Sequence, residues 1–358
     1  MKNKIFPVFK TKTPGLKRKF KLEDPEERQK YFQAKAGREI GKIKKFLIKN
    51  SFMGILLGKK NSGKGTYIKL FMEAVGAEHI KHISIGDIVR SVHKDLSNPK
   101  KRKALVEFLN DRYRGFISIK QALDIIEGRD TKTLLPTEII LALVEKEIDK
   151  ADRKAIFIDG FPRTHDQIPY SLFLKALMGY RNDPDFIVFI NVPEQVMDQR
   201  IKTRVICPTC KTPRSARVLR TKEVGYDEKT KEFYLICDNP GCPNPKRMIS
   251  KEGDHLGIKN IRDRINTDGE IMRKLLELKG IPKVFLRNSV PVSQARKFID
   301  DYEITPGYRY KWDDKNKKVV GIEEPWVVKD DEGKRSYSLL PTAVVVGMIK
   351  QVAEALAL

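Results

Sequence analysis

A glycine-rich stretch near residue 60 constrains the fold of this chain more than any other feature. Residues 58–66 read Gly-Lys-Lys-Asn-Ser-Gly-Lys-Gly-Thr, after an apolar run at 52–57 that is typical of a buried strand. Residues 67–74 have the apolar spacing of a helix. Strand, glycine-rich loop, lysine and helix in this order predict a phosphate-binding loop, because glycines let backbone N–H groups wrap an anion at a helix N-terminus.

One detail of this loop departs from the general motif. Gly65 stands where Ser or Thr commonly follows the lysine, and the hydroxyl comes one residue later, at Thr66. Lys64 would add a point charge for the terminal phosphates of a nucleotide. A solvent-exposed turn is the alternative, but the flanking strand and helix favour phosphate binding. The candidate nucleotide-binding residues of the loop are Gly58, Asn61, Ser62, Gly63, Lys64, Gly65 and Thr66.

Length and charge restrict the class of protein further. The 358 residues are enough for two or three structural units, and the formal net charge is +24. Such a charge favours polyanionic partners such as nucleotides, RNA, DNA or acidic lipid, although a lysine-rich proteome would explain it equally well. No signal peptide and no apolar run of about 18 residues is present. We therefore expect a cytoplasmic monomer with no membrane-spanning segment.

The first 50 residues form a basic leader, with 16 Lys and Arg residues against 5 Asp and Glu. Asp24-Pro25-Glu26-Glu27 predicts the start of a helix that runs to Lys49. The lysines before it predict a flexible cationic arm that binds RNA or another polyanion. The alternative is that the arm only adds solubility.

Alternation of strands and helices predicts the fold class. Strand candidates at 52–57, 79–85, 155–159 and 186–192 are separated by helical stretches, such as 137–150 and 193–204, and a further helix is expected at 256–279. This order indicates an α/β fold with a central parallel, doubly wound sheet between helices. The expected organisation is a basic extension (1–50), a core (51–204) with a helical insert (about 86–150), a cysteine-containing module (205–254), a helix and the rest of the core (255–301), and a hairpin with a final helix (302–358).

All four cysteines of the chain lie in two pairs, Cys207 with Cys210 and Cys237 with Cys242. The pairs are separated by 26 residues with two strand-like runs, 215–220 and 232–236. Two thiolate pairs joined by a hairpin suit a tetrahedral Zn²⁺ ion. Four reduced thiols are the alternative. The metal would be structural, because no open ligand position is evident.

Asp159 ends the third predicted strand. A carboxylate at the end of a buried strand beside a phosphate-binding loop could hold, through water, the Mg²⁺ that accompanies a nucleotide. The alternative is a residue that caps the following turn.

Several separated segments together resemble the adenylate kinase family of nucleoside monophosphate kinases. The loop 58–66 and the segment 159–164, Asp-Gly-Phe-Pro-Arg-Thr, carry the resemblance, and segments 84–90, 191–194 and 261–264 agree in order and spacing. It covers about residues 52–266. It implies a P-loop three-layer αβα fold, an inserted monophosphate-binding domain, a zinc-type lid with four cysteine ligands, and phosphoryl transfer from ATP·Mg²⁺ to a nucleoside monophosphate.

The resemblance also implies roles for individual residues. Lys64 would stabilise the donor phosphates, and Arg90 and Arg163 would hold the acceptor phosphate. Ser84, Ile85, Gly160 and Gln167 would complete the acceptor site, with Gln167 reading the base. Arg200, Arg204 and Arg264 would act from the lid side in catalysis, and the first two would also bind ATP.

Two positions depart from the family pattern. Ile85 stands where the family usually has Thr or Ala, which bears on the choice of acceptor base. A lid arginine is missing, so that Lys251 or Arg247 would substitute for it. We expect AMP as the acceptor. The alternatives are a kinase for UMP or CMP, and an adenylate kinase-like ATPase that binds RNA or a ribonucleoprotein.

Overall fold

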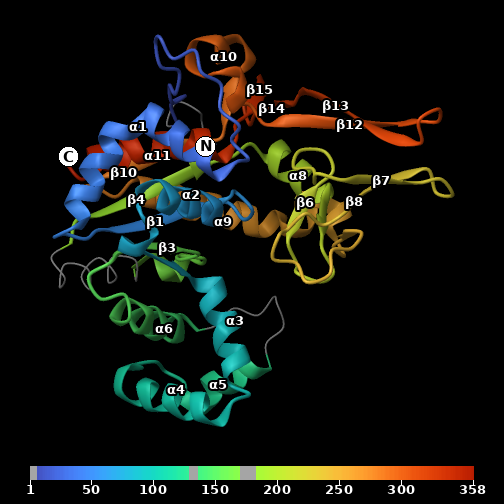
Figure 1. Ribbon diagram of the computed structural model, residues 1–358. Helices are drawn as coiled ribbons and strands as arrows, with labels where there is room; N and C mark the ends of the chain where they lie inside the picture. The colour runs from blue at the N-terminus through green and yellow to red at the C-terminus, as the bar shows by residue number, and fades with distance from the viewer. Residues whose placement is uncertain (1–5, 129–135, 170–182) are drawn as a thin grey trace.

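The computed structural model describes residues 6–128, 136–169 and 183–358. Its centre is a five-stranded sheet in the order β10–β4–β1–β3–β2, in which every pairing is parallel (Figure 1). This confirms the predicted α/β class. The strands are β1 (Met53–Gly58), β2 (Ile80–Ser84), β3 (Ala155–Asp159), β4 (Asp185–Asn191) and β10 (Lys283–Arg287). Sequence analysis did not identify β10, whose short apolar run lies between Lys283 and Arg287 at the edge of the sheet.

Helices cover both faces of the sheet. The helices α1 (Pro25–Leu47), α2 (Lys64–Val75) and α11 (Pro341–Ala355) share one apolar core with Leu56 of β1, whereas α9 (Arg262–Leu276) packs against Ile55 and Leu57. Successive side chains of a strand point to opposite faces, so a strand buried on both faces is apolar throughout. The loop after β1 therefore lies at the carboxyl end of a fully buried central strand.

The helix predicted from Asp24 is present as α1. The Asp24 carboxylate accepts hydrogen bonds from the N–H groups of Glu26 and Glu27, and Pro25 occupies the first turn. Its buried face includes Tyr31, which packs toward α11 and the C-terminal region. The basic leader thus contributes one of the helices that cover the sheet.

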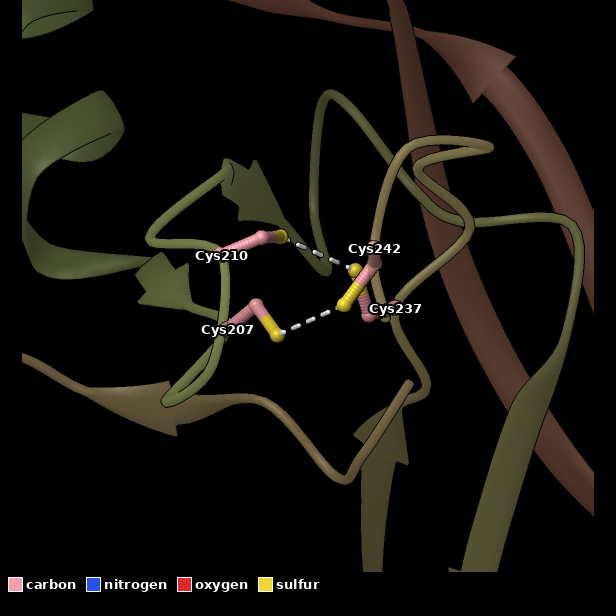
Figure 2. Close-up of side chains that lie close together, drawn as sticks. All are labelled: Cys207, Cys210, Cys237 and Cys242. Atoms are coloured by element: carbon pink, nitrogen blue, oxygen red, sulfur yellow. Dashed lines mark hydrogen bonds between the residues drawn. The ribbon is translucent and has the colours of Figure 1, made fainter. Parts of the chain in front are cut away.

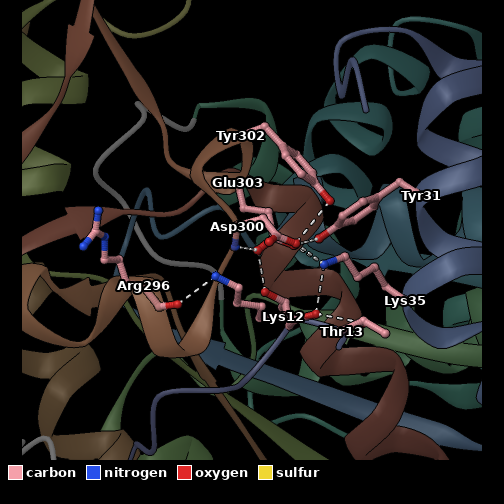
Figure 3. Close-up of polar contacts among 9 residues, drawn as sticks. Lys12, Thr13, Tyr31, Lys35, Arg296, Asp300, Tyr302 and Glu303 are labelled. Atoms are coloured by element: carbon pink, nitrogen blue, oxygen red, sulfur yellow. Dashed lines mark hydrogen bonds and ion pairs between the residues drawn. The ribbon is translucent and has the colours of Figure 1, made fainter. Parts of the chain in front are cut away.

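The prediction of a flexible arm before α1 is wrong for the described residues 6–22. Phe6 is fully buried against Phe285, and Phe20 and Leu22 join the main core. Thr11 donates a hydrogen bond to the buried Glu303 carboxylate. These contacts hold the segment against the core and the C-terminal region, and Figure 3 shows another polar one, from the Lys12 ammonium to the Arg296 carbonyl. Lys2 and Lys4 lie outside the described residues.

A helical insert follows β2. It comprises α3 (Ile85–Asp95), α4 (Pro99–Arg112), α5 (Ile119–Glu127) and α6 (Thr137–Asp149). These helices bury Leu109, Leu123 and Leu143 in a core that also includes Ile156 and Ile158 of β3. Asn98 caps α4, and Ser118 forms a capping box with Gln121 at the start of α5.

The cysteine-containing module, residues 205–254, is called the lid below. Its strands are β5 (Arg204–Ile206), β6 (Pro213–Ser215), β7 (Val224–Asp227), β8 (Glu232–Leu235) and β9 (Ile249–Ser250), of which β7 and β8 form a hairpin. The strand expected at 215–220 is wrong, because residues 216–218 form a turn. The Ser215 hydroxyl accepts the Val218 N–H, and Ser215 and Leu219 exchange backbone hydrogen bonds across the turn.

The lid is joined to the core by α8 (Glu194–Lys202) before it and by the 3₁₀ helix η3 (Asp254–Ile261) and α9 after it. The helix predicted to reach Arg204 ends at Lys202, because Arg204 already pairs in β5. The helix predicted at 256–279 starts later, as α9 at Arg262. Three short 3₁₀ helices also lie in the described residues: η1 (Ala77–His79), η2 (His165–Gln167) and η4 (Asp301–Glu303).

The C-terminal region contains the predicted hairpin, β12 (Pro306–Asp313) and β13 (Lys318–Pro325). A second small sheet, in the order β11–β15–β14, combines β11 (Ser289–Pro291) with β14 (Val327–Lys329) and β15 (Arg335–Ser338). The short helix α10 (Val292–Phe298) follows β11. Within the described ranges, every helix is too short or too polar to cross a bilayer.

Candidate nucleotide-binding site

The loop between β1 and α2 is wound tightly at the carboxyl end of the central strand. Gly63 and Asn61 have left-handed backbones, with φ of 92° and 67°. A Cβ atom on Gly58 would lie 2.6 Å from the Ser62 hydroxyl oxygen, so a larger residue would displace Ser62. The Lys64 ammonium donates to the Gly58 carbonyl at 2.8 Å and thus lies over the loop. Gly65 and Thr66 open α2, and Thr66 is exposed.

Cations from three parts of the chain gather around this loop. Burial lowers the pKa of Lys64, and the nearby Arg264 and Arg163 lower it further, against the opposing effect of Asp159 and Asp268. Burial also lowers the pKa of Lys60, as do Arg264, the lid residue Lys251, and Arg163. Excess positive charge at a glycine-rich loop would be relieved by a bound polyphosphate.

Asp268 holds this cationic cluster to the loop, and sequence analysis missed it. One carboxylate oxygen accepts the Lys60 backbone N–H at 2.8 Å, and the other forms an ion pair with the Arg264 guanidinium at 2.9 Å. Burial raises the pKa of Asp268, although Arg264 and Lys64 oppose that effect. Arg264 also donates to the Arg163 carbonyl at 3.0 Å. The spacing of Arg264 and Asp268 by four residues on one helix was the available sequence signal.

Asp159 lies beside the loop, at the end of β3, as predicted. Its carboxylate pairs with Nε2 of His82 at 3.0 Å, and both side chains are mostly buried. The His82 ring lies 3.8 Å from where a Cβ of Gly65 would be. A carboxylate at this position fits a water-mediated contact with the magnesium of a nucleotide. His82 was not recognised from the sequence.

The two arginines expected at the acceptor site converge on Gly86. A Cβ on Gly86 would lie 3.4 Å from the Arg90 guanidinium and 3.5 Å from that of Arg163. Arg163 also donates from Nε to the carbonyl of Gly160, a residue with a φ of 87°. Arg90 is largely exposed and pairs with Asp87 one helical turn earlier. Two guanidiniums above a glycine form a suitable site for a phosphate group.

The residues expected to read the acceptor base have other contacts in the structure. Gln167 is only 2% exposed: its side-chain oxygen accepts the Arg163 backbone N–H, and its nitrogen donates to Thr137. Ile85 is 1% exposed within the core of the insert. Ser84 precedes α3 and hydrogen-bonds the Asp87 carboxylate. Gln167 therefore orients Arg163, and base reading stays a prediction for it.

Arg200 and Arg204, where α8 leads into the lid, both have hydrogen-bond partners in the structure. The Arg204 guanidinium donates twice to Asp254, at 2.7 and 2.6 Å, which joins the entry and the exit of the lid. Arg200 donates to the Ser338 hydroxyl at 3.4 Å and contacts Tyr67, and burial lowers its pKa. Their predicted contacts with ATP therefore require both side chains to exchange partners.

The structure separates the two candidate substitutes for the missing lid arginine. Arg247 pairs with Asp227 and lies over the Tyr234 ring at 4.4 Å, on the β7–β8 hairpin. Lys251 acts electrostatically on Lys60 of the loop. Of the two candidates, Lys251 is the one whose charge acts on the loop.

The four cysteine sulfurs converge in the lid (Figure 2). All lie within 4.8 Å of one another, with Cys207 and Cys242 at 3.8 Å and Cys210 and Cys237 at 3.6 Å. Tetrahedral zinc with Zn–S bonds of about 2.3 Å would separate its sulfurs by about 3.8 Å. Hydrogen bonds with Thr212 and Asn239 lower the pKa of Cys210 to about 5, whereas burial and the neighbouring thiols raise the pKa of Cys242 and raise that of Cys237 to about 12. The geometry fits a structural Zn²⁺.

Known proteins match the part of the chain that contains this site. Residues 57–206 match a family profile described as an AAA domain. An adenylate kinase of Kosmotoga olearia is 32% identical over 158 residues, which are 44% of this chain and 60% of that protein. A probable UMP-CMP kinase 2 of Arabidopsis thaliana is 28% identical over 157 residues, 44% of this chain and 49% of its own length. An adenylate kinase of Chlamydia felis is 30% identical over 167 residues, 46% of this chain and 64% of that protein.

The core of this chain is therefore similar in sequence to adenylate kinases and to a UMP-CMP kinase. The chain spans about half to two thirds of the length of these relatives. More than half of this chain lies outside each of these matches.

Proposed function

We propose that this protein is a nucleoside monophosphate kinase that transfers the γ-phosphoryl group of ATP·Mg²⁺ to AMP. The observation that carries the proposal is the connection of two phosphate sites by one hydrogen-bonded chain. Arg163 faces Gly86 on the acceptor side, its carbonyl accepts from Arg264, and Arg264 pairs with Asp268, which holds the loop at Lys60. Alignment of two nucleotides is the main requirement of phosphoryl transfer.

The chemistry follows from positioning and charge. The loop and Lys64 would bind the donor phosphates, and Arg90 and Arg163 would orient the acceptor phosphate oxygen in line with the γ-phosphorus. Arg264 and Lys251 would stabilise the charge on the transferring group from the lid side. Asp159 would hold the waters of the magnesium, which neutralises phosphate charge when bound. Arg200 and Arg204 would join after leaving Ser338 and Asp254.

The acceptor base is the least constrained part of the proposal. The buried Ile85 offers no hydrogen-bonding group, and the Arabidopsis relative is named a UMP-CMP kinase. A UMP or CMP kinase is therefore the second candidate. A coupled assay with ATP and each of AMP, UMP, CMP and GMP tests both. ATP hydrolysis without dependence on any monophosphate would contradict the kinase proposal.

The proposal includes one structural zinc in the lid, held by the four cysteine thiolates. RNA binding by the leader remains a separate proposal that depends on charge alone, because residues 6–22 are packed on the core. A salt titration of RNA binding tests it, since phosphate contacts weaken steeply with salt.

A further inference from the structure

We propose that residues 302–340, called the strap below, tie the lid to the core and limit how far the lid moves over the phosphate-binding loop. The strap consists of the hairpin β12–β13 and the pair β14–β15. In Figure 1 the hairpin β12–β13 projects on the same side of the molecule as the lid hairpin β7–β8. The contacts of the strap are independent of the proposed function, and only its effect on ATP use rests on that function.

Aromatic rings form the main contact between strap and lid. Trp312 stacks on Tyr226 of β7, with ring centroids 4.7 Å apart and planes inclined by 22°. Tyr226 contacts Phe233 of β8 at 4.9 Å, and Phe233 contacts Tyr310 at 5.7 Å. Tyr310 and Trp312 are two residues apart in one strand and therefore point to the same face. Four rings, two from each hairpin, thus form a continuous contact.

Hydrogen bonds fix the orientation of this contact. The Tyr310 hydroxyl donates to the Ala216 carbonyl at 2.7 Å, and the Tyr308 N–H donates to the Arg217 carbonyl at 2.8 Å. The Arg220 guanidinium lies 4.7 Å from the centre of the Tyr308 ring. A two-stranded hairpin is marginally stable alone, so the two hairpins stabilise each other.

The other end of the strap is built into the core. The Thr305 N–H donates to the Ser338 carbonyl at 2.8 Å, and Trp326 is 4% exposed in the main apolar core. β15 pairs with β11, which follows the core strand β10 by one residue. Movement of the lid away from the core must therefore bend the hairpin or break its contact with the lid.

The strap also reaches the root of the lid and the phosphate-binding loop. The Asp331 carboxylate accepts the Glu194 N–H at 2.8 Å and lies 3.9 Å from the Lys59 ammonium. Lys59 pairs with the Glu194 side chain at 2.8 Å. Glu194 begins α8, the helix that leads into the lid. The strap is thus in contact with the lid body, the lid root and the first lysine of the loop.

Two variants and a matched control test the strap. Trp312→Ala removes the stacked ring, and Tyr310→Phe keeps every ring but removes the bond to Ala216. Lys311→Ala, between them, changes an exposed side chain on the opposite face. Hydrogen exchange of residues 224–235 should be about 2- to 10-fold faster in Trp312→Ala, because this factor corresponds to the stabilisation that one aromatic pair provides. Tyr310→Phe should show a smaller increase, and exchange in β1 and β4 should not change.

The KM for ATP should rise by a similar factor, while the KM for the monophosphate should match the Lys311→Ala control. Circular dichroism and zinc content confirm that each variant is folded. If hydrogen exchange of the lid in folded Trp312→Ala and Tyr310→Phe proteins equals that of the control, the proposal that the strap ties the lid to the core is refuted. Faster hydrogen exchange of the lid with an unchanged KM for ATP would refute the proposal that the strap limits movement of the lid over the loop. If the wild-type protein transfers no phosphoryl group, the proposed function is refuted. The hydrogen-exchange result still shows whether the strap holds the lid.

Discussion

Removal of Arg163 should selectively damage use of the acceptor nucleotide. The structure fixes this guanidinium through its Nε bond to the Gly160 carbonyl, 2.7 Å long, and through Gln167, which accepts the Arg163 N–H. A hydrogen bond to a charged group contributes about 1.5–3 kcal/mol. Arg163→Ala should therefore raise the KM for the monophosphate about 10- to 150-fold. Arg90 is largely exposed and less fixed, so Arg90→Ala should have a smaller effect in the same direction.

A coupled spectrophotometric assay measures this, with ATP saturating and the monophosphate varied, and then the reverse. Arg102→Ala is the control, because Arg102 is an arginine of the helical insert that pairs with Glu127. Arg163→Lys keeps the charge but cannot hold the Gly160 carbonyl and grip two phosphate oxygens together, so it should restore only part of the loss. The reasoning is refuted if the KM for ATP rises as much as that for the monophosphate, or if Arg163→Ala behaves like Arg102→Ala.

Three further changes test other parts of the site. Lys64→Ala should lower turnover roughly a hundredfold or more, as loss of a transition-state electrostatic contact does, and a smaller loss would remove Lys64 from the catalytic group. The wild-type protein should contain one zinc per chain, and each Cys→Ser substitution at 207, 210, 237 or 242 should remove it and unfold the lid before the core. Metal analysis measures the zinc, and hydrogen exchange measures the unfolding of the lid. Zinc-free wild-type protein from a chelator-free preparation would contradict the zinc site. Asp268 binds its proton more tightly in the native than in the unfolded state, because burial raises its pKa above 3.8. Its contribution to stability should therefore fall as pH rises from about 3.8 through the native value, and Asp268→Asn should remove that part of the pH dependence in urea titrations. Identical pH curves for both proteins would refute this.

Local patterns in the sequence were sufficient for the elements that carry most of the site. The loop between β1 and α2 was predictable because Gly58 and Gly63 are required by short contacts and a left-handed backbone that the local turn itself creates. The convergence of the four cysteine sulfurs was predictable because the spacing of the two pairs along the chain is that of known tetrahedral metal sites. Asp268 and His82 were missed because their partners, Lys60 and Asp159, are distant in sequence.

The sequence by itself determined the parallel α/β class, the glycine-rich loop after β1 and the convergence of the four cysteines, since each depends on periodicity or spacing within a short segment. Only the tertiary structure decided how the remaining segments are used. The leader, whose charge suggested a free arm, is held on the core by Phe6, Phe20 and the bond from Thr11 to Glu303. The strap contacts the lid through Trp312 and Tyr226, which are far apart in the chain. Contacts of this kind depend on which surfaces the packed sheet brings together, so local composition does not predict them.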